Sequence, residues 1–431
     1  MSKEENRKNF SKYVSQNILG MIGFSCYVLA DSYFISIAKG ADGLTALNLV
    51  MPLYSIIFSI GEMIGVGSAI RYAISKIKKD ADADDYFWNA LIWCILSSML
   101  FVFAGIFFSA DIMRVLGADE HIVAVGNNYT KIFMCFAPMF MCNYVTNAFV
   151  RNDGAPGIAM SATLFSSLFN IVFDYILMFP MNLGMEGAAL ATALSPIIGM
   201  GICSIHFFSK KSSVRLVVCK PSVRKLVAGS QLGVSAFVGE MSSAVITLAF
   251  NFVILKLAGN VGVAAYGVVA NIAIVTTAVF NGVAQGSQPL ISSCFGRGDK
   301  DGCTQLKRMG YTTAFVLAAV MYSILFIFAG QFVAVFNSEG SEMLRLYATE
   351  GVKLYFIGIF FAGINIVSGG AFSATEDAFK AAVVSVARGF VLILGAVFVM
   401  SALFGMTGVW LAYAVAEGIT TFIMLVMVLR V

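Results

Sequence analysis

Long stretches without any charged residue constrain the fold of this chain more than any other feature. They contain 25 residues between Asp85 and Asp111, 30 between Arg308 and Glu339, and 40 between Lys256 and Arg297. A helix needs about 20 apolar residues to cross a bilayer, and these stretches lack the polar face of a soluble core helix. Charged residues make up 12% of the chain, against roughly 25% in a soluble domain. The chain is therefore expected to be an all-α membrane protein.

The apolar runs predict about twelve transmembrane helices in two sets. A stretch with six basic residues and no acid, 209–228, separates them, which predicts an N-terminal bundle (1–208), a basic linker (209–228) and a C-terminal bundle (229–431). The expected spans are 14–37, 46–70, 86–109, 125–149, 158–180, 186–208, 229–256, 264–293, 311–335, 346–373, 379–402 and 406–429.

The basic residues predict the orientation of these spans. We assign 21 Lys and Arg residues to the side of the N-terminus, Arg151 and Arg430 included, and only four to the opposite side. Lys131, Lys353 and Arg388 lie near expected helix ends and are not counted. Because cytoplasmic loops carry the excess of basic residues, both termini and the linker are expected on the cytoplasmic side of the membrane.

The two halves resemble each other at a nearly constant shift. Gly40 and Gly43 match Gly259 and Gly262 at a shift of 219, and LGMEG at 183–187 matches FGMTG at 404–408 at a shift of 221. Because six spans per half is an even number, both halves begin on the same side and form parallel repeats. Such repeats place a cavity between the halves.

Few acids lie inside the expected spans, and a carboxylate within a membrane usually faces protein or water and marks function. A misplaced helix end is a credible alternative for Glu62 and Glu417, but not for Asp31 in VLADSYFISI or Asp174 in NIVFDYILMF. Asn170 shares a helix face with Asp174, four residues on. The remaining acid and the polar residues considered with this group are Glu240, Asn143, Asn147 and Thr192.

Several motifs, in their order and spacing along the whole chain, resemble the multidrug and toxic compound extrusion (MATE) transporters, nearest their bacterial MepA-like branch. The motifs are NLVMPLYSIIFSIGEMIGVGSA, FVRNDGAPGIAM, NIVFDYILMF followed by GMEGAALAT, GVAQGSQPLISSCFG and GVWLAYAVAEGIT. The resemblance implies a V-shaped pair of six-helix bundles in a bacterial inner (plasma) membrane. It also implies export of cationic or amphipathic small molecules, as in multidrug efflux, by antiport with H⁺ or Na⁺.

The resemblance further implies a cation-coupling site in the N-terminal bundle. Asp31, Asn170, Asp174 and Thr192 occupy its positions, Asn147 fits a fifth, and Na⁺ at this site is the only metal ion expected. Glu240 matches one acid of a C-terminal cation site found in another branch, but its partner position is Ala362, which puts a complete second site in doubt. Glu240 and Glu62 are instead expected to bind substrate.

Alternative functions differ in the residues they would need. No GxxxxGK[ST] motif for a nucleotide-driven pump is present, and neither His121 nor His206 neighbours a plausible metal motif, so no enzyme and no cofactor are expected. A flippase or exporter of a lipid-linked or other metabolite, from the same superfamily, remains an alternative. Flippases for anionic lipid carriers tend to have basic cavities, whereas the charges inside these spans are mostly acidic. The expected partners are small cationic molecules and the lipid bilayer, not nucleic acid, and the protein is expected to be a monomer.

Overall fold

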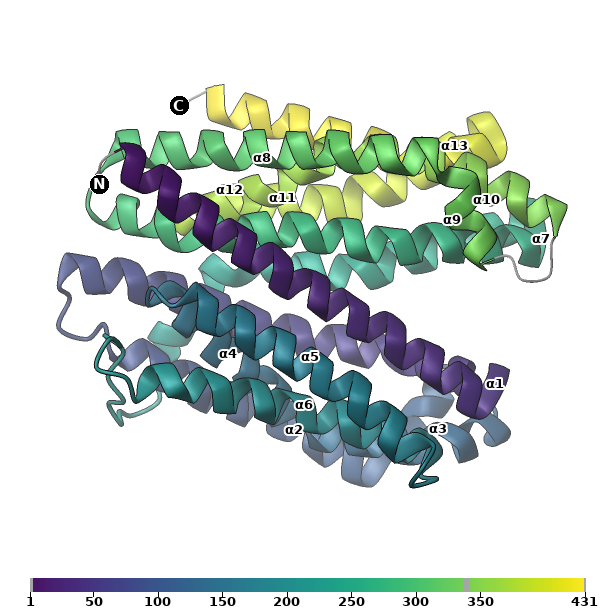
Figure 1. The fold of residues 1–431 in the computed structure, drawn as a ribbon, viewed down its shortest axis with the longest axis horizontal. Helices are drawn as coiled ribbons and strands as arrows, with labels where there is room; N and C mark the ends of the chain where they lie inside the picture. Colours follow the sequence, from purple (N-terminus) through teal and green to yellow (C-terminus); the bar gives the residue numbers. More distant parts are fainter. Residues whose placement is uncertain (1–2, 337–340, 430–431) are drawn as a thin grey trace.

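The chain forms two groups of long helices that lie side by side (Figure 1). The structure, a computed structural model, describes residues 3–336 and 341–429, and every regular element in those ranges is helical. Arg430, counted above among the basic residues, lies outside the described residues. The prediction of an all-α membrane fold is confirmed.

Within the described residues, the first half contains six α-helices and the second half seven, with a non-helical connection between them. The first six are α1 (Lys3–Lys78), α2 (Asp85–Val115), α3 (Glu120–Cys135), α4 (Ala137–Asn152), α5 (Pro156–Met178) and α6 (Gly184–Phe207). The others are α7 (Val223–Gly296), α8 (Lys300–Ile327), α9 (Ala329–Phe336), α10 (Glu342–Tyr355), α11 (Ile359–Ala374), α12 (Ala378–Val386) and α13 (Leu392–Leu429). Because α7 begins at Val223, the last residues of the expected linker are helical; the domain boundaries themselves stay predictions.

These helices provide twelve membrane spans. Within the described residues, nine helices are long and apolar enough to cross a membrane, and the bent pair α3 and α4 forms a tenth. Two of the nine, 74 and 51 residues long, contain Gly259 or Gly405 in a non-helical conformation. An unbroken 74-residue helix would extend about 110 Å, far beyond a bilayer, so each of the two folds back and supplies two spans.

Glycines at matching positions of the two halves make the same turns. Gly40 has φ 58° and ψ −141°, and Gly259 has φ 61° and ψ −157°. Gly184 and Gly405, which match at the shift of 221 residues, have φ values of 51° and 58°. A residue with a Cβ rarely adopts such a positive φ, so glycine at each position permits the reversal. The internal repeat expected from the sequence is therefore confirmed in the backbone.

The fourth span differs from its expected form. Instead of one helix over 125–149, α3 ends at Cys135 and α4 begins at Ala137, with an angle of 46° between them. Pro138 in the first turn of α4 has no backbone N–H to donate to the carbonyl four residues earlier, and its ring crowds that carbonyl. The proline therefore explains the break.

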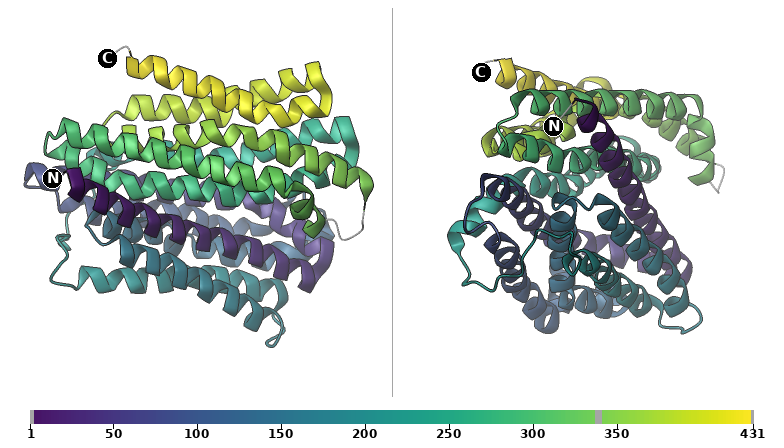
Figure 2. Two further views of the ribbon diagram at one scale, coloured as in Figure 1. Left: turned by 45° about the horizontal axis from the view of Figure 1, so that its top comes forward. Right: turned by 60° about the vertical axis from the view of Figure 1, so that its left-hand side comes forward.

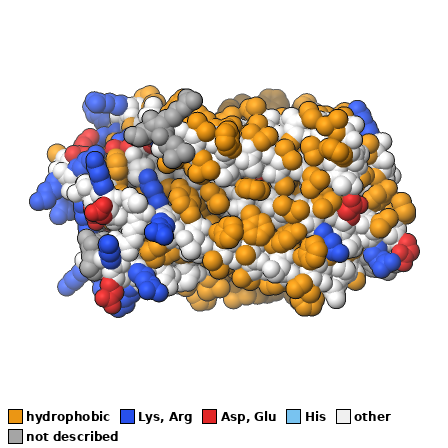
Figure 3. All heavy atoms as spheres, turned by 90° about the horizontal axis from the view of Figure 1, so that it is seen from above, with side chains coloured by type: hydrophobic (Ala, Val, Ile, Leu, Met, Phe, Trp, Pro, Cys, Tyr) orange, Lys and Arg blue, Asp and Glu red, His pale blue; other side chains and the backbone are white. Residues whose placement is uncertain are grey.

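On the face shown in Figure 3, most Lys and Arg side chains lie at one end of the molecule, here called the basic end. An apolar surface covers the middle, and helix α1 begins and helix α13 ends at the basic end (Figures 1 and 3). Arg71 forms an ion pair with Glu376 of the other half. Gly67 and Gly233 also let α1 and α7 pack closely, since a Cβ at either would lie within 2.1 Å of backbone oxygen.

Helix α1 belongs to both halves. Its beginning crosses the second half, and its later turns reach the first half (Figure 2). Near its start, Asn6 donates a hydrogen bond to Gln305 of α8, 3.2 Å away. Gly282 and Gly286 of α7 allow the backbone of α1 to approach at Ile18 and Val14. The helix is unbroken from Lys3 to Gly40, in keeping with the absence of proline from its first span.

Candidate functional site

Three helices of the first half bring four of the expected coupling residues into the interior. Asp31 comes from α1, Asn170 and Asp174 from α5, and Thr192 from α6. All four are buried, with Asn170 and Asp174 fully inaccessible. The amide Nδ2 of Asn170 donates to Thr192 Oγ1 over 3.2 Å. The carboxyl groups of Asp31 and Asp174 interact electrostatically, so the fold joins residues more than 140 positions apart.

The polar oxygens of this cluster are poorly satisfied. Both carboxylate oxygens of Asp174, Oδ1 of Asp31 and Oδ1 of Asn170 are buried and have no hydrogen-bond partner among the described residues. Leaving a buried polar atom unpaired costs about 1–3 kcal/mol, and more for a charged group. Carboxylate, amide and hydroxyl oxygens are ligands for a hard cation, and a carboxylate can instead take up a proton. The cluster therefore has the chemistry to bind either one.

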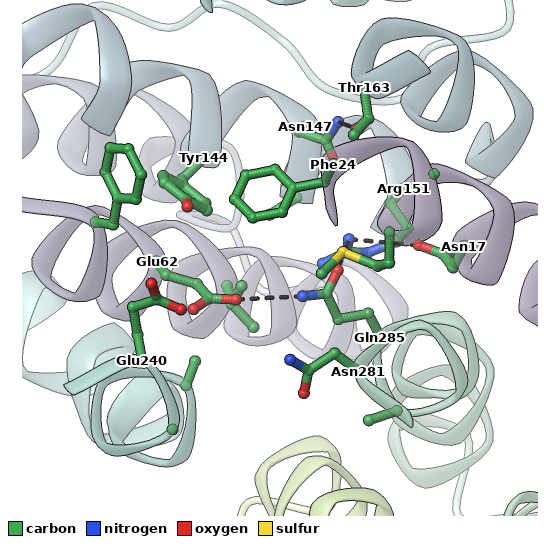
Figure 4. A pocket seen from close by; sticks show the side chains of 18 of the residues that line it. Asn17, Phe24, Glu62, Tyr144, Asn147, Arg151, Thr163, Glu240, Asn281 and Gln285 are labelled. Atoms are coloured by element: carbon green, nitrogen blue, oxygen red, sulfur yellow. Dashed lines mark hydrogen bonds between the residues drawn. The ribbon is translucent and has the colours of Figure 1, made fainter. Parts of the chain in front are cut away.

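Asn147 forms its hydrogen bonds with residues outside that cluster. Its Nδ2 donates to the carbonyl oxygen of Ala159 at 3.1 Å and to Thr163 Oγ1 at 3.2 Å. These bonds join α4 to α5, and Asn147 faces the central cavity (Figure 4). Asn143 lines the same cavity. Four of the five residues expected at the coupling site are thus buried, and the fifth, Asn147, lines the cavity.

A cavity between the two halves contains both acids that were expected to bind substrate. Glu62 of α1 and Glu240 of α7 line it, and their carboxylates point toward each other (Figure 4). Glu62 accepts a hydrogen bond of 3.2 Å from Gln285 Nε2. Glu62 lies 16 residues before the end of α1, so the interpretation as a misplaced helix end is wrong. Two facing carboxylates create a negative field that favours a positive guest.

Arg151 was missed as a cavity residue. It was assigned to a basic loop, but it lies in the last turn of α4 and is 4% exposed. Its Nη1 donates to Gln285 Oε1 at 2.7 Å and to Asn17 Oδ1 at 3.5 Å. A chain of hydrogen bonds thus runs from Arg151 through Gln285 to Glu62. The position of Arg151 at the end of an apolar run is typical of a loop residue, and nothing in the sequence pattern shows that it turns inward.

The second half contains a buried acid that is fully paired. Glu417 lies in the middle of a span, so the interpretation as a helix end is wrong here too, and Arg388 is likewise not at a helix end. Arg388 Nη2 donates to Glu417 Oε1 at 2.6 Å, and Asn365 Nδ2 donates to Oε2 at 2.7 Å. Ala362 is buried among apolar residues and offers no acid to Glu240. The charges inside the spans are therefore more balanced than the sequence suggested.

A further cluster of hydrogen bonds, around Asp153, connects the start of the linker (209–228) to the first half. Asp153, between α4 and α5, accepts hydrogen bonds from His206 Nε2 at 2.7 Å and from Ser212 Oγ at 3.0 Å. It also accepts hydrogen bonds from Ser213 through both the backbone N–H and the hydroxyl. This accounts for His206, whose role the sequence left open: it orders the polypeptide that connects the halves.

Twelve spans in two repeats, a polar cavity between them and a buried acidic cluster in one repeat define a polytopic membrane protein built like a transporter. The MatE family profile matches residues 17–176 and 236–399, one segment in each half. The chain belongs to the MatE family.

Curated relatives agree with this membership over nearly the whole chain. The multidrug export protein MepA of Staphylococcus aureus strain MRSA252 is 27% identical over 414 residues, covering 93% of this chain and 89% of the relative. MepA of Staphylococcus saprophyticus is 26% identical over 409 residues, with the same shares covered.

Solved structures show the same fold. A crystal structure of a MATE protein in complex with MaL6 matches with a TM-score of 0.92 at 20% identity, covering 99% of this chain and 96% of the other. A transporter from Pyrococcus furiosus, described as having a binding pocket of reversed polarity, matches with a TM-score of 0.90 at 20% identity. It covers 98% of this chain and 95% of the other. The expectation of a MATE-type pair of bundles is confirmed.

Proposed function

We propose that this protein is a secondary transporter that exports cationic or amphipathic small molecules in exchange for H⁺ or Na⁺. The observation that carries this proposal is the separation of two acidic sites. Asp31 and Asp174 are buried inside the first half with unpaired oxygens, whereas Glu62 and Glu240 face the cavity between the halves. One site suits a small coupling ion and the other a larger organic cation. The MepA relatives, which are named as multidrug export proteins, support the same assignment.

The geometry suggests how ion binding is transmitted. When ionised, Asp31 and Asp174 repel each other in a region that excludes water, and a bound proton or cation removes that cost. Asp31 lies on α1, whose beginning contacts α7 and α8 of the other half. A shift of α1 upon ion binding therefore moves the surface that joins the halves. Coupling arises because the same helix carries the ion ligand and the contact.

We further propose that the basic end faces the cytoplasm, as the charge asymmetry predicts. In that orientation the contacts at the basic end, such as the Arg71–Glu376 ion pair, close the cytoplasmic side of the cavity. A cysteine replacing exposed Lys211 in the linker should resist an impermeant thiol reagent in intact cells, on a background without other cysteines. A cysteine replacing exposed Met181, at the opposite end, is the matched control and should react. The reverse labelling pattern would overturn the orientation.

Transport in vesicles tests the function directly. Purified protein reconstituted into liposomes should move a fluorescent organic cation only when a proton or sodium gradient is imposed, and the two gradients are applied separately. Glu62→Gln is the matched cavity variant, and it should weaken cation transport while leaving the choice of coupling ion unchanged. Equal cation movement with and without either gradient would contradict the proposal.

A flippase of anionic lipid-linked compounds is the second candidate, and Arg151 is the observation that favours it. Its guanidinium faces the cavity, and its Nε has no hydrogen-bond partner among the described residues. The two carboxylates in the same cavity oppose an anionic guest. The same liposomes, loaded with a fluorescent anionic lipid, should show no accelerated exchange between leaflets. Exchange that requires Arg151, without transport of the organic cation, would favour the flippase.

A further inference from the structure

The second half contains an ion pair that the proposed transport cycle does not use. Glu417 accepts hydrogen bonds from Arg388 through Nη2 at 2.6 Å and through Nε at 3.1 and 3.2 Å. Asn365 Nδ2 lies 2.7 Å from Glu417 Oε2 and 2.9 Å from the Glu417 backbone oxygen. Each carboxylate oxygen of Glu417 thus has at least two donors. This acid is as deeply buried as Asp174, yet its charge is fully matched.

Without the guanidinium of Arg388, the cluster around Glu417 would consist of side-chain oxygen ligands and the amide of Asn365. Both carboxylate oxygens of Glu417 remain, and Asn365 Oδ1 accepts a hydrogen bond from Thr421 Oγ1 at 3.1 Å. An acid, an amide and a threonine hydroxyl are the same three ligand types that Asp174, Asn170 and Thr192 supply in the first half. The two clusters therefore share three ligand types. They differ in that the first also contains the acid Asp31, whereas the second also contains the cation Arg388.

The position of Arg388 is consistent with a cation that occupies this group of oxygens. It lies in a π-helical turn, Ala387–Val391, where the helix is locally widened between α12 and α13. Such turns inside α-helices often occur at functional sites. The Arg388 side chain is 14% exposed and lines the central cavity, whereas that of Glu417 is 2% exposed and is not among the described residues that line it. The guanidinium therefore stands between the acid and the cavity through which a free cation would arrive.

We propose that Arg388 is a tethered counter-cation that occupies a latent monovalent-cation site formed by Glu417, Asn365 and Thr421. The covalently attached guanidinium supplies the positive charge that Asp31 and Asp174 must obtain from solution. The second half consequently needs no coupling ion, and removing Arg388 opens its site to a soluble cation. The comparison with the coupling ion rests on the proposed function, whereas the occupancy of the Glu417 site by Arg388 does not, because it concerns what Glu417 binds and not what the protein transports.

Thermal unfolding of the purified full-length protein in detergent tests the proposal without a transport assay. Asp31→Asn and Asp174→Asn are introduced first, so that sodium binding in the first half does not contribute. On that background Arg388→Ala should melt several degrees lower in choline chloride, because a buried acid loses its partner. Sodium chloride or methylguanidinium chloride at the same ionic strength should restore more than half of that loss.

Two matched variants separate this idea from a purely structural ion pair. Arg388→Met removes the charge but fills the space, so it should lose stability without recovering in methylguanidinium. Arg388→Ala with Glu417→Gln removes both charges, and should regain stability in choline and ignore added cations. Two results would overturn the proposal. One is an Arg388→Ala variant that melts identically in choline, sodium and methylguanidinium. The other is recovery by these cations that is equal with and without Glu417.

If Arg388→Ala does not accumulate as folded protein, the expression level of the double variant, Arg388→Ala with Glu417→Gln, tests the proposal instead. The proposal predicts that Glu417→Gln rescues its expression, because the uncompensated charge is gone. Loss of the double variant to the same extent would contradict it, since the guanidinium would then be needed for packing and not as a counter-charge.

Discussion

The two halves have the same backbone fold but differ in whether their buried acids are paired. In the first half, the oxygens of Asp174 have no hydrogen-bond partner among the described residues, and in the second half Glu417 is held by Arg388 and Asn365. Applying the repeat shifts places Phe250 opposite Asp31 and Tyr413 opposite Thr192. The comparison teaches that symmetry of fold does not impose symmetry of chemistry: among the described residues, one half leaves buried acid oxygens unpaired, and the other pairs its buried acid with an arginine.

Aromatic residues occupy two of the positions in the second half that are equivalent to the polar cluster of the first. Phe250 stacks on Tyr266 with ring centres 5.0 Å apart, and Tyr413 stacks on Tyr355 with ring centres 4.4 Å apart. Gly395 takes the place that corresponds to Asp174. Such packing stabilises the second half without any dependence on ion concentration. Ion-linked changes should therefore begin in the first half, and the predictions below challenge that asymmetry.

The largest expected effect comes from Asp31→Asn. An amide has nearly the same shape but cannot gain or lose the proton, or neutralise a cation, so gradient-driven export should be abolished. The protein should still insert in the membrane and elute as a folded species in size-exclusion chromatography. Normal export by this variant, measured in the liposome assay, would remove Asp31 from the mechanism.

Thr192→Ala and Asn170→Ala should have an intermediate effect. Each removes one end of the 3.2 Å hydrogen bond beside the carboxylates, together with one oxygen that could contact an ion. Loss of such supporting groups weakens ion binding by about 10-fold. The ion concentration or pH at half-maximal export should shift, whereas the maximal rate should fall less. Thr421→Ala, in the second half, is the matched control and should leave that midpoint unchanged.

Glu240→Gln should change affinity for cargo more than dependence on the ion. Its carboxylate faces Glu62 across the cavity, and half of the negative charge of that pair would be lost (Figure 4). Affinity for organic cations should fall by roughly 3- to 10-fold, which corresponds to about 1 kcal/mol. Transport rates measured over a range of cargo concentrations decide the matter. A shift in the ion midpoint, with unchanged cargo affinity, would assign Glu240 to ion binding.

The smallest expected effect lies outside the membrane, at the end opposite the basic end. His121 Nε2 contacts Asp42 Oδ2 at 2.9 Å, and this hydrogen bond and the carboxylate charge raise the pKa of His121 above its ordinary value. The contact is at full strength below the ordinary pKa and is lost as pH rises through the raised one. Asp42→Asn should lower the pKa in an NMR titration, in which His206 is the only other histidine signal. An unchanged titration would show that the contact does not form in solution.

The overall fold and the acids could be predicted from the sequence because both depend on local composition. Uncharged runs identify spans, and an acid within a run such as NIVFDYILMF is conspicuous. Glycine matches at constant shifts also predicted the internal repeat, and the structure shows positive φ values at four of the matched glycines, Gly40, Gly184, Gly259 and Gly405. These are properties of a residue and its immediate neighbours, which a single sequence displays.

The paired charges could not be predicted, because pairing depends on contacts between distant helices. Arg388 lies near the end of an apolar run and Glu417 is 29 residues away, so their 2.6 Å contact is set by the packing of two separate spans. Arg151 was assigned to a loop for the same reason, although it turns into the cavity to reach Gln285. The sequence shows where a charge lies along the chain, but only the fold shows which group neutralises it.

Side-by-side transport by two variants tests most directly whether a single half responds to the ion. Asp174→Asn, and the double variant Arg388→Ala with Glu417→Gln, are compared with the unaltered protein in liposomes under the same series of ion gradients. Asp174→Asn should lose its response to the gradient, whereas the double variant should keep the ion midpoint of the unaltered protein. A double variant that loses its ion dependence, together with an Asp174→Asn variant that keeps it, would place coupling in the second half and contradict this account.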